Sequence, residues 1–199
     1  MELYAFRRSE NVETNTKEKI LIAASHLFRK QGYHATTLNQ ISKESSTPRG
    51  SVYYYFENGK EQLAQEAILR TGQIIKQHIE EALAIESDAA KAIYTHLRNI
   101  ADEIEQQKEK TDIFSLVAIS REVSDSNTIL LKTCEEVYDN WINVFAYKIK
   151  QSGFSEKEAL ELAITIQAMI EGAYALMVSQ QNVTAMRIVS EQVLKLLHR

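Results

Sequence analysis

Residues 46–63, STPRGSVYYYFENGKEQL, combine side chains that could read the edge of a base pair and grip a phosphate. Arg49 carries paired N–H donors, which match the O6 and N7 acceptors of guanine in the major groove. Gly50 and Ser51 are small, so a helix that carries them could bring its backbone close to base edges. Residue types in this pattern predict a surface that contacts double-stranded DNA.

Three consecutive tyrosines follow these residues, and helical geometry separates them. Successive helical positions lie about 100° apart, so Tyr53, Tyr54 and Tyr55 cannot share one face. We expect Tyr54 and Tyr55 to offer hydroxyls to phosphates and Tyr53 to lie at the edge of the groove. The alternative is that all three are half-buried core aromatics, and for Tyr53 alone the sequence leaves both interpretations open.

Two further residues complete the predicted phosphate contacts. Lys60, at the start of the next helix, would clamp a phosphate with its ammonium group. Thr37 would use its hydroxyl and the free amides of the helix start behind it. Val52 and Phe56 lie four positions apart, so we expect them to pack inward and fix the exposed face of the helix.

Three helices must position these side chains. Apolar residues at helical spacing predict a first helix with Thr16 as its N-cap and Gly32 at its end. Thr37 and Gln40 form a capping-box pattern, so a second helix starts at Leu38 and ends near Ser45. A third helix runs to about Tyr55, with Thr47 as N-cap and Pro48 at its first position. Two short helices behind a longer one predict a helix-turn-helix unit.

The rest of the chain predicts long helices. The 199 residues contain one proline and six glycines, and few points therefore interrupt helical periodicity. The expected fold is all-α with about nine helices, the later six covering residues 60–86, 88–107, 112–123, 127–151, 155–181 and 184–198. The helix over 155–181 opens with a capping box of Ser155 and Glu158.

Residues 20–63 resemble the DNA-binding region of TetR-family transcriptional repressors, with matches in LFRKQGYHATTLNQIS and GSVYYYFENGKEQL. The resemblance implies DNA contacts from Thr37, Asn39, Arg49, Gly50, Ser51, Tyr53, Tyr54 and Lys60. The chain departs from the family pattern in two places: the turn SST lacks the usual glycine, and ENGK has one extra residue. The segments GYHATTLNQI, NGKE and NWINVF are similar to the LmrA/YxaF branch of that family.

The resemblance also implies a division of the chain. Residues 1–14 would be a flexible arm, 15–60 the three-helix helix-turn-helix domain, and 61–199 a helical domain for ligand binding and dimerisation. The last two helices are apolar on more than one face, which favours pairing with a second copy. The alternative is that both are core helices of a monomer.

Aromatic and methionine side chains of the later helices are candidates for an apolar ligand pocket. The candidate set is Tyr94, Phe114, Tyr138, Trp141, Phe145, Met169, Glu171 and Tyr174. Ordinary core packing is the alternative for each aromatic. Glu171 interrupts an apolar run and could meet a polar or cationic group of a ligand, or it could form a salt bridge or face solvent.

Charge and composition exclude several other classes of protein. Residues 1–60 carry nine Lys/Arg and six Asp/Glu, whereas the remainder carries fourteen and twenty-one, so only the first part suits a polyanion. The single cysteine, Cys134, allows no internal disulfide, and the five histidines show no metal-ligand spacing. No nucleophile–base arrangement or phosphate loop indicates an enzyme. We expect no cofactor and no metal.

No apolar stretch suggests a signal peptide or approaches the length of a membrane span, so a cytoplasmic protein is expected. The resemblance implies a dimeric repressor of a palindromic operator, released by a small hydrophobic or aromatic inducer and controlling a multidrug efflux or detoxification gene. The main alternative is an all-helical protein–protein adaptor without specific DNA binding.

Overall fold

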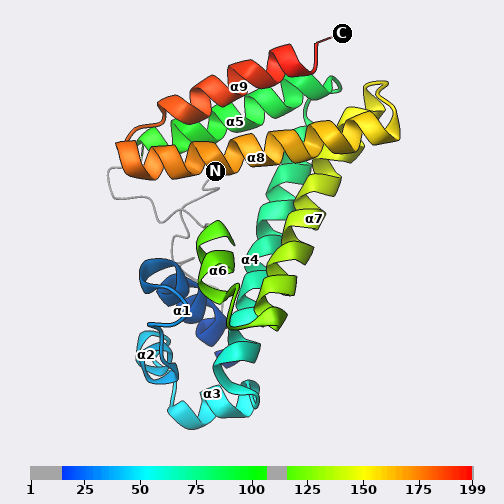
Figure 1. Ribbon diagram of the computed structural model, residues 1–199. Coiled ribbons are helices and arrows are strands. Elements are labelled where there is room, and N and C mark those ends of the chain that lie inside the picture. The colour runs from blue at the N-terminus through cyan, green and yellow to red at the C-terminus, as the bar shows by residue number, and fades with distance from the viewer. Residues whose placement is uncertain (1–14, 107–115, 199) are drawn as a thin grey trace. The chain divides into compact units, whose positions relative to one another are not determined.

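The computed structural model describes residues 15–106 and 116–198, and every regular element in these ranges is an α-helix (Figure 1). The elements are α1 (Thr16–Gln31), α2 (Leu38–Glu44), α3 (Arg49–Tyr55), α4 (Gly59–Ala84), α5 (Ala89–Gln106), α6 (Leu116–Val123), α7 (Thr128–Gln151), α8 (Glu156–Gln180) and α9 (Thr184–Leu196). The all-α prediction is confirmed for the described residues. The expected arm over 1–14 and the expected helix start at 112 lie outside them.

The described chain divides into two compact units. We call residues 15–74 and 116–137 the head unit, and residues 75–106 and 138–198 the body unit. The division falls within α4 and within α7, so each of these helices supplies its first part to the head and its second part to the body. The functional boundary expected after residue 60 falls at the start of α4 and stays a prediction.

Local capping signals set the first two helix starts. The N-cap of α1 is Asn15, whose Oδ1 accepts the amide of Glu18 at 2.9 Å; the prediction of Thr16 was wrong by one residue, because Thr16 is already helical. The capping box of α2 is confirmed: Gln40 donates its amide to the Thr37 hydroxyl, and Thr37 donates its own amide to the Gln40 side chain.

The start of α3 differs from the prediction. Pro48 occupies the N-cap position without a side-chain cap, and the helix begins at Arg49. Thr47 is not the cap, because its hydroxyl lies 2.7 Å from that of Ser45 and its carbonyl accepts the Ser42 hydroxyl at 2.6 Å. These bonds hold the α2–α3 turn together and leave Thr47 buried.

The α2–α3 turn contains a non-glycine residue in the left-handed region. Ser46 has φ +53, where a Cβ costs roughly 1 kcal/mol or more. A glycine would be favoured at position 46, because it has no Cβ.

Replacing Ser46 by glycine should raise the free energy of unfolding by up to about 1 kcal/mol, because relief of the strain exceeds the entropy that glycine adds to the unfolded chain. Urea unfolding followed by circular dichroism would measure the change. Ser45→Gly is the matched control and should destabilise, since Ser45 has φ −76 and its hydroxyl is bonded. Equal losses from both substitutions would contradict the assignment of strain to Ser46.

Buried side chains of α1, α2 and α3 form the core of the head unit. Ile41 of α2 is fully buried, as are Val52 of α3 and Phe56 directly after it, and Ile20 and Phe28 of α1 join them. The inward packing predicted for Val52 and Phe56 is confirmed. Burying one side of α3 in this way presents its opposite side to solvent.

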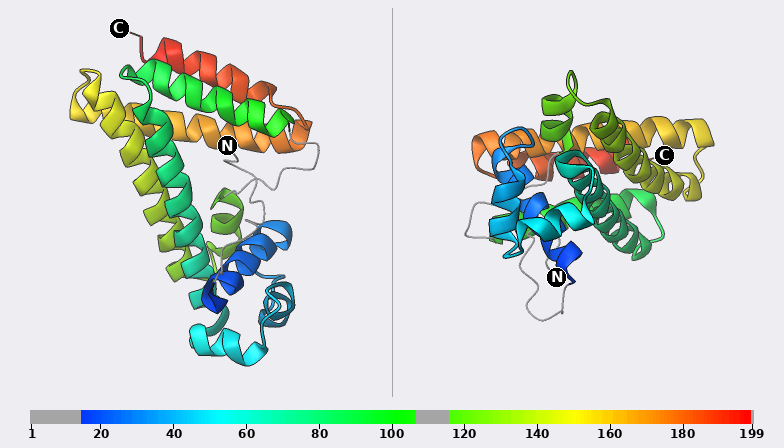
Figure 2. Two further views of the ribbon diagram at one scale, coloured as in Figure 1. Left: turned by 180° about the vertical axis from the view of Figure 1, so that it is seen from behind. Right: turned by 90° about the horizontal axis from the view of Figure 1, so that it is seen from below.

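The body unit is built around packing of α9 along both α5 and α8, which all views show side by side (Figures 1 and 2). The predicted capping box of α8 is confirmed, with the Ser155 hydroxyl accepting the Glu158 amide at 3.3 Å. Arg187 of α9 donates to Asp102 at 2.9 Å and to Glu105 at 2.7 Å, which fixes α9 to α5.

Helix α8 corrects one sequence-based expectation. By length and composition alone it could cross a membrane, although no apolar stretch was expected to reach that length. Core helices of soluble proteins have the same length and composition, so this feature is weak evidence for a membrane span.

Candidate DNA-binding surface and candidate ligand residues

Helix α3 exposes the residues predicted to meet DNA. Arg49 and Gly50 are exposed, and a Cβ added at Gly50 would meet nothing within 4 Å. Tyr53 is 42% exposed and Tyr54 is 75% exposed, whereas Ser51 is half-buried. The open space at Gly50 leaves the helix backbone accessible there.

The tyrosines separate as helical geometry predicts. Tyr54 lies on the surface, and its ring meets that of the half-buried Tyr55 edge-on at 5.0 Å between centroids. Tyr53 is also a surface residue, so the core alternative is wrong for Tyr53 and Tyr54. The Tyr55 ring packs against the Tyr54 ring, and Tyr55 remains partly exposed to solvent.

The guanidinium of Arg49 is held by its own helix. Its Nη2 donates to the Tyr53 hydroxyl at 3.1 Å, and its Cζ lies 5.4 Å from the centroid of the Tyr53 ring. The two residues are four positions apart and hence neighbours on one helix face. A guanidinium restrained in this way loses less conformational entropy when it meets a base.

Lys60 has different partners from those predicted. Its ammonium donates to the carbonyl oxygens of Tyr33 and Thr36, each at 3.1 Å, and reaches that of His34 at 3.5 Å. It also lies 4.3 Å from the centroid of the Tyr33 ring. Burial lowers the pKa of Lys60, and the nearby Glu122 carboxylate opposes that shift. In this structure the three donors of Lys60 hold the α1–α2 turn instead of standing free for a phosphate.

Glu122 of α6 also bonds the α1–α2 turn. Its Oε2 accepts the amide of Tyr33 at 2.6 Å and that of His34 at 3.2 Å, and its carbonyl oxygen lies 2.9 Å from the His34 Nε2. Gly32 has φ +85, and a Cβ there would overlap the Glu122 carboxylate. Sequence reasoning missed Glu122, because it lies 89 positions beyond Tyr33 and no local pattern joins them.

The two candidates on α2 are at the surface. Thr37 and Asn39 are exposed, but the Thr37 hydroxyl is engaged with Gln40, to which it donates at 2.9 Å. Asn39 follows one position into the helix. The start of α2 and the exposed side of α3 therefore belong to the same head unit. Lys60 bonds the α1–α2 turn, which leads into α2.

The structure brings three of the ligand candidates together in the body unit. The rings of Tyr138 and Trp141 meet edge-on at 5.7 Å between centroids, and the Tyr138 side chain lies close enough to Glu171 to influence its pKa. Gln167 donates to Glu171 at 3.1 Å. Burial raises the pKa of Glu171, and the polar side chains of Tyr138 and Gln167 oppose the shift. Glu171 is thus a half-buried carboxyl group among aromatic and amide side chains.

The remaining candidates are less concentrated. Trp141 and Phe145 are buried, which fits ordinary core packing as well as a pocket wall. The Tyr94 hydroxyl donates to Glu191 of α9 at 3.4 Å, and Met169 and Tyr174 are half-buried. Phe114 lies outside the described residues.

His96 is buried beside Phe145 in the body unit, and burial together with His78 lowers its pKa from 6.5 to about 4. The unfolded chain therefore binds more protons between these values, and folding stability should fall by up to about 3 kcal/mol as pH drops from 6.5 to 4. Urea unfolding at several pH values would show this slope, and His96→Leu should reduce it. Glu171 acts in the opposite direction in both proteins, so an unchanged slope in the variant would contradict the assignment to His96.

The described residues contain no group of three or more His, Cys, Asp or Glu side chains arranged to hold a metal ion. Cys134 is buried, and burial raises the pKa of its thiol, which makes it a poor nucleophile. Neither feature supplies a site for catalysis within this part of the chain.

A helix-turn-helix head that exposes arginine and tyrosine on its second short helix, joined to a helical body, defines a class of DNA-binding transcriptional regulators. The chain belongs to the TetR family of bacterial regulatory proteins. The family's N-terminal domain matches residues 20–67, and the domain described as "Transcriptional regulator LmrA/YxaF-like, C-terminal domain" matches residues 89–192. The LmrA/YxaF placement predicted from the sequence is therefore confirmed.

The chain is 38% identical to the HTH-type transcriptional regulator YxaF of Bacillus subtilis, over 90% of this chain and 93% of the relative. It is 37% identical to the regulator LmrA of the same organism, over 93% of this chain and 98% of the relative. Among solved structures, Escherichia coli NemR in its reduced form matches with a TM-score of 0.82 at 20% identity, covering 90% of this chain and 95% of that chain. The NemR match shows the fold. YxaF and LmrA are transcriptional regulators rather than enzymes, and they do not favour the adaptor alternative.

Proposed function

We propose that this protein is a ligand-responsive repressor that binds a palindromic operator as a homodimer and is released by a small hydrophobic or aromatic inducer. The observation that carries the proposal is the exposed face of α3, where Arg49, Tyr53 and Tyr54 stand out from a helix whose other side is buried. A helix presented in this way fits the major groove.

The DNA contacts follow from that geometry. Arg49 reads a guanine, while Gly50 and Ser51 allow the helix to approach the base edges. Tyr53, Tyr54, Thr37 and Asn39 contact the phosphate backbone and fix the register. Lys60 acts indirectly: its bonds to the α1–α2 turn hold the start of α2 in place.

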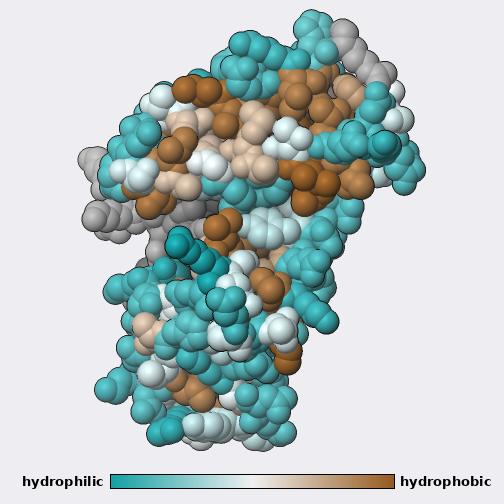
Figure 3. Space-filling model, viewed as in Figure 1, coloured by the Kyte–Doolittle hydropathy of each residue, from teal (hydrophilic) through white to brown (hydrophobic). Residues whose placement is uncertain are grey.

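A homodimer explains the apolar surface of the last two helices. Large apolar side chains are about half exposed along α8 and α9, and Figure 3 shows apolar residues gathered over these helices. They are Leu160, Ile164, Leu176 and Val178 on α8 and Ile188 on α9. Pairing with a second copy would bury them and supply the two-fold symmetry of a palindromic operator.

The inducer would bind in the body domain, expected to be residues 61–199, where Tyr138, Trp141 and Glu171 meet. Aromatic rings around a carboxyl group of raised pKa suit an apolar ligand with one polar group. The ligand lowers DNA affinity only as far as it prefers the state that does not bind DNA. By resemblance to the LmrA/YxaF branch, the regulated gene is one for multidrug efflux or detoxification. The repressor itself would act in the cytoplasm.

The test is binding of the purified protein to fluorescent DNA from the region upstream of its own gene, followed by anisotropy over a range of salt concentrations. We expect tight binding to a palindromic segment, an affinity that falls steeply with salt, and a mass in sedimentation of two chains per operator or a multiple. One compound in a panel of aromatic drugs should release the DNA. Binding without sequence preference at every salt concentration would contradict the repressor function.

A further inference from the structure

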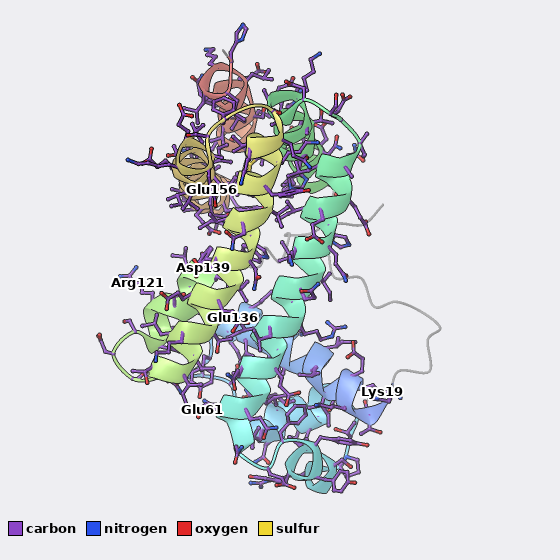
Figure 4. All side chains as sticks on the ribbon, turned by 90° about the vertical axis from the view of Figure 1, so that its right-hand side faces the viewer. Lys19, Glu61, Arg121, Glu136, Asp139 and Glu156 are labelled. Atoms are coloured by element: carbon purple, nitrogen blue, oxygen red, sulfur yellow. The ribbon has the colours of Figure 1, made fainter. Side chains whose placement is uncertain are left out.

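The body unit has a groove that shares none of the ligand candidates above. It lies between the second parts of α4 and α7, which run side by side (Figure 4), and has a volume of about 470 Å³. Such a volume suits a small organic molecule. Its walls include Lys76, Glu80 and Leu83 of α4 and Asn143, Tyr147 and Lys148 of α7.

Lys148 gives the groove a buried positive charge. The residue is only 8% exposed, and its ammonium donates to the carbonyl oxygen of Glu86, just beyond the end of α4. Within the described residues it forms no ion pair, so a carbonyl dipole is its one partner and two donors remain. An anion in the groove would supply the counter-charge that this ammonium lacks among the described residues.

The other polar groups of the groove favour the same ligand chemistry. Lys76 carries a second ammonium, which is 3.6 Å from the Glu80 carboxylate. Asn140 and Asn143 are exposed amides that can donate to a bound oxygen. With two lysines and one glutamate in its walls, the groove is positive overall, although the whole chain carries a net charge of −4.

The rest of the groove is apolar. Leu83 and Val144 form its wall, and the ring of Tyr147 is 66% exposed beside them. A large aromatic side chain left in solvent at a groove is suited to stacking on a flat ligand. Trp141 and Phe145 of the same helix are buried and do not line the groove, so it is separate from the aromatic cluster around Glu171.

We propose that the α4–α7 groove is a second ligand site, which takes a small aromatic carboxylate. The ring of the ligand lies against Tyr147 and Val144, and its carboxylate accepts hydrogen bonds from Lys148. This site goes beyond the proposed operator binding and does not depend on it.

The test is calorimetric titration of the full-length protein with naphthoate, and with the neutral naphthamide as the matched ligand. Lys148→Met keeps the aliphatic stem and removes the charge, and should weaken naphthoate binding at least about tenfold. Lys150→Met is the control, because Lys150 lies on the same helix, is exposed and pairs with Glu156 outside the groove. Asn143→Trp fills the groove from an exposed position and should also abolish binding.

We expect the wild type and Lys150→Met to bind naphthoate equally and naphthamide at least about tenfold more weakly. If Lys148→Met fails to fold, Asn143→Trp decides the location, since an exposed residue carries it. The proposal is overturned if naphthoate does not bind, if it binds Asn143→Trp as tightly as the wild type, or if naphthamide binds equally well. Operator binding measured on the same samples separates these outcomes from a failure of the repressor function.

Discussion

Replacing Arg49 by alanine should weaken binding to the operator by between about tenfold and about a hundredfold, and should remove the preference for guanine at one position in each half-site. A paired contact from arginine to guanine contributes roughly 1–3 kcal/mol of discrimination, and alanine offers no donor to the base. The measurement is anisotropy with the operator and with variants changed at one base pair at a time. If affinity and base preference both stayed as in the wild type, α3 would not be the helix that reads the sequence.

Two comparison variants separate base reading from simple loss of charge. Lys132→Ala removes one positive charge from an exposed position on α7 of the head unit, and should leave base preference intact. Tyr53→Phe keeps the ring beside the guanidinium but removes the hydroxyl that accepts from Arg49. For Tyr53→Phe we expect a smaller loss of operator affinity, about two- to tenfold, at the same base position. The reason is that Arg49 would then lose more conformational entropy on binding.

Replacing Gly32 by alanine should lower the free energy of unfolding by about 2.5–6 kcal/mol. The positive φ of Gly32 is strained for a residue with a Cβ, at a cost of roughly 1–3 kcal/mol. The new methyl group would also displace the Glu122 carboxylate, which accepts the amides of Tyr33 and His34. Losing hydrogen bonds to a charged group adds about 1.5–3 kcal/mol. Urea unfolding of the full chain would measure the change.

A double-mutant cycle with Glu122→Ala distinguishes the two causes. If the carboxylate is what the methyl group displaces, Gly32→Ala should cost less in the Glu122→Ala background than in the wild type. The remaining cost is then the backbone strain alone. Equal costs in both backgrounds would show that Glu122 moves aside freely and does not hold the turn.

The sequence predicted those parts of the fold that depend on neighbouring residues. The capping boxes of Thr37 with Gln40 and of Ser155 with Glu158 act over three positions, and both helices start where these patterns place them. The inward side of α3 also followed from local spacing, since Val52 and Phe56 are four positions apart and both are fully buried. Exposure of Tyr54 on the other side agrees with that spacing, whereas the sequence left Tyr53 open between core and surface and only the structure shows it exposed.

The parts that could not be predicted depend on contacts between distant segments. Lys60 has the residue type and place of a phosphate ligand, yet its ammonium bonds the carbonyl oxygens of a turn 24–27 positions earlier. Thr47 has the pattern of an N-cap, but the Ser45 hydroxyl competes for it. The groove beside Lys148 arises only where α4 and α7 meet, and apolar periodicity in either helix gives no sign of it.

The grip of Glu122 on the α1–α2 turn also places a spectroscopic probe in the backbone. The amide proton of Tyr33 is bonded to a carboxylate at 2.6 Å rather than to a helical carbonyl, so its NMR signal should lie far downfield of ordinary amides. Its exchange with solvent deuterium requires the turn and α6 to separate locally. The rate at which that single proton disappears therefore reports how often the head unit opens at this turn, with or without DNA and ligands, in the unlabelled native protein.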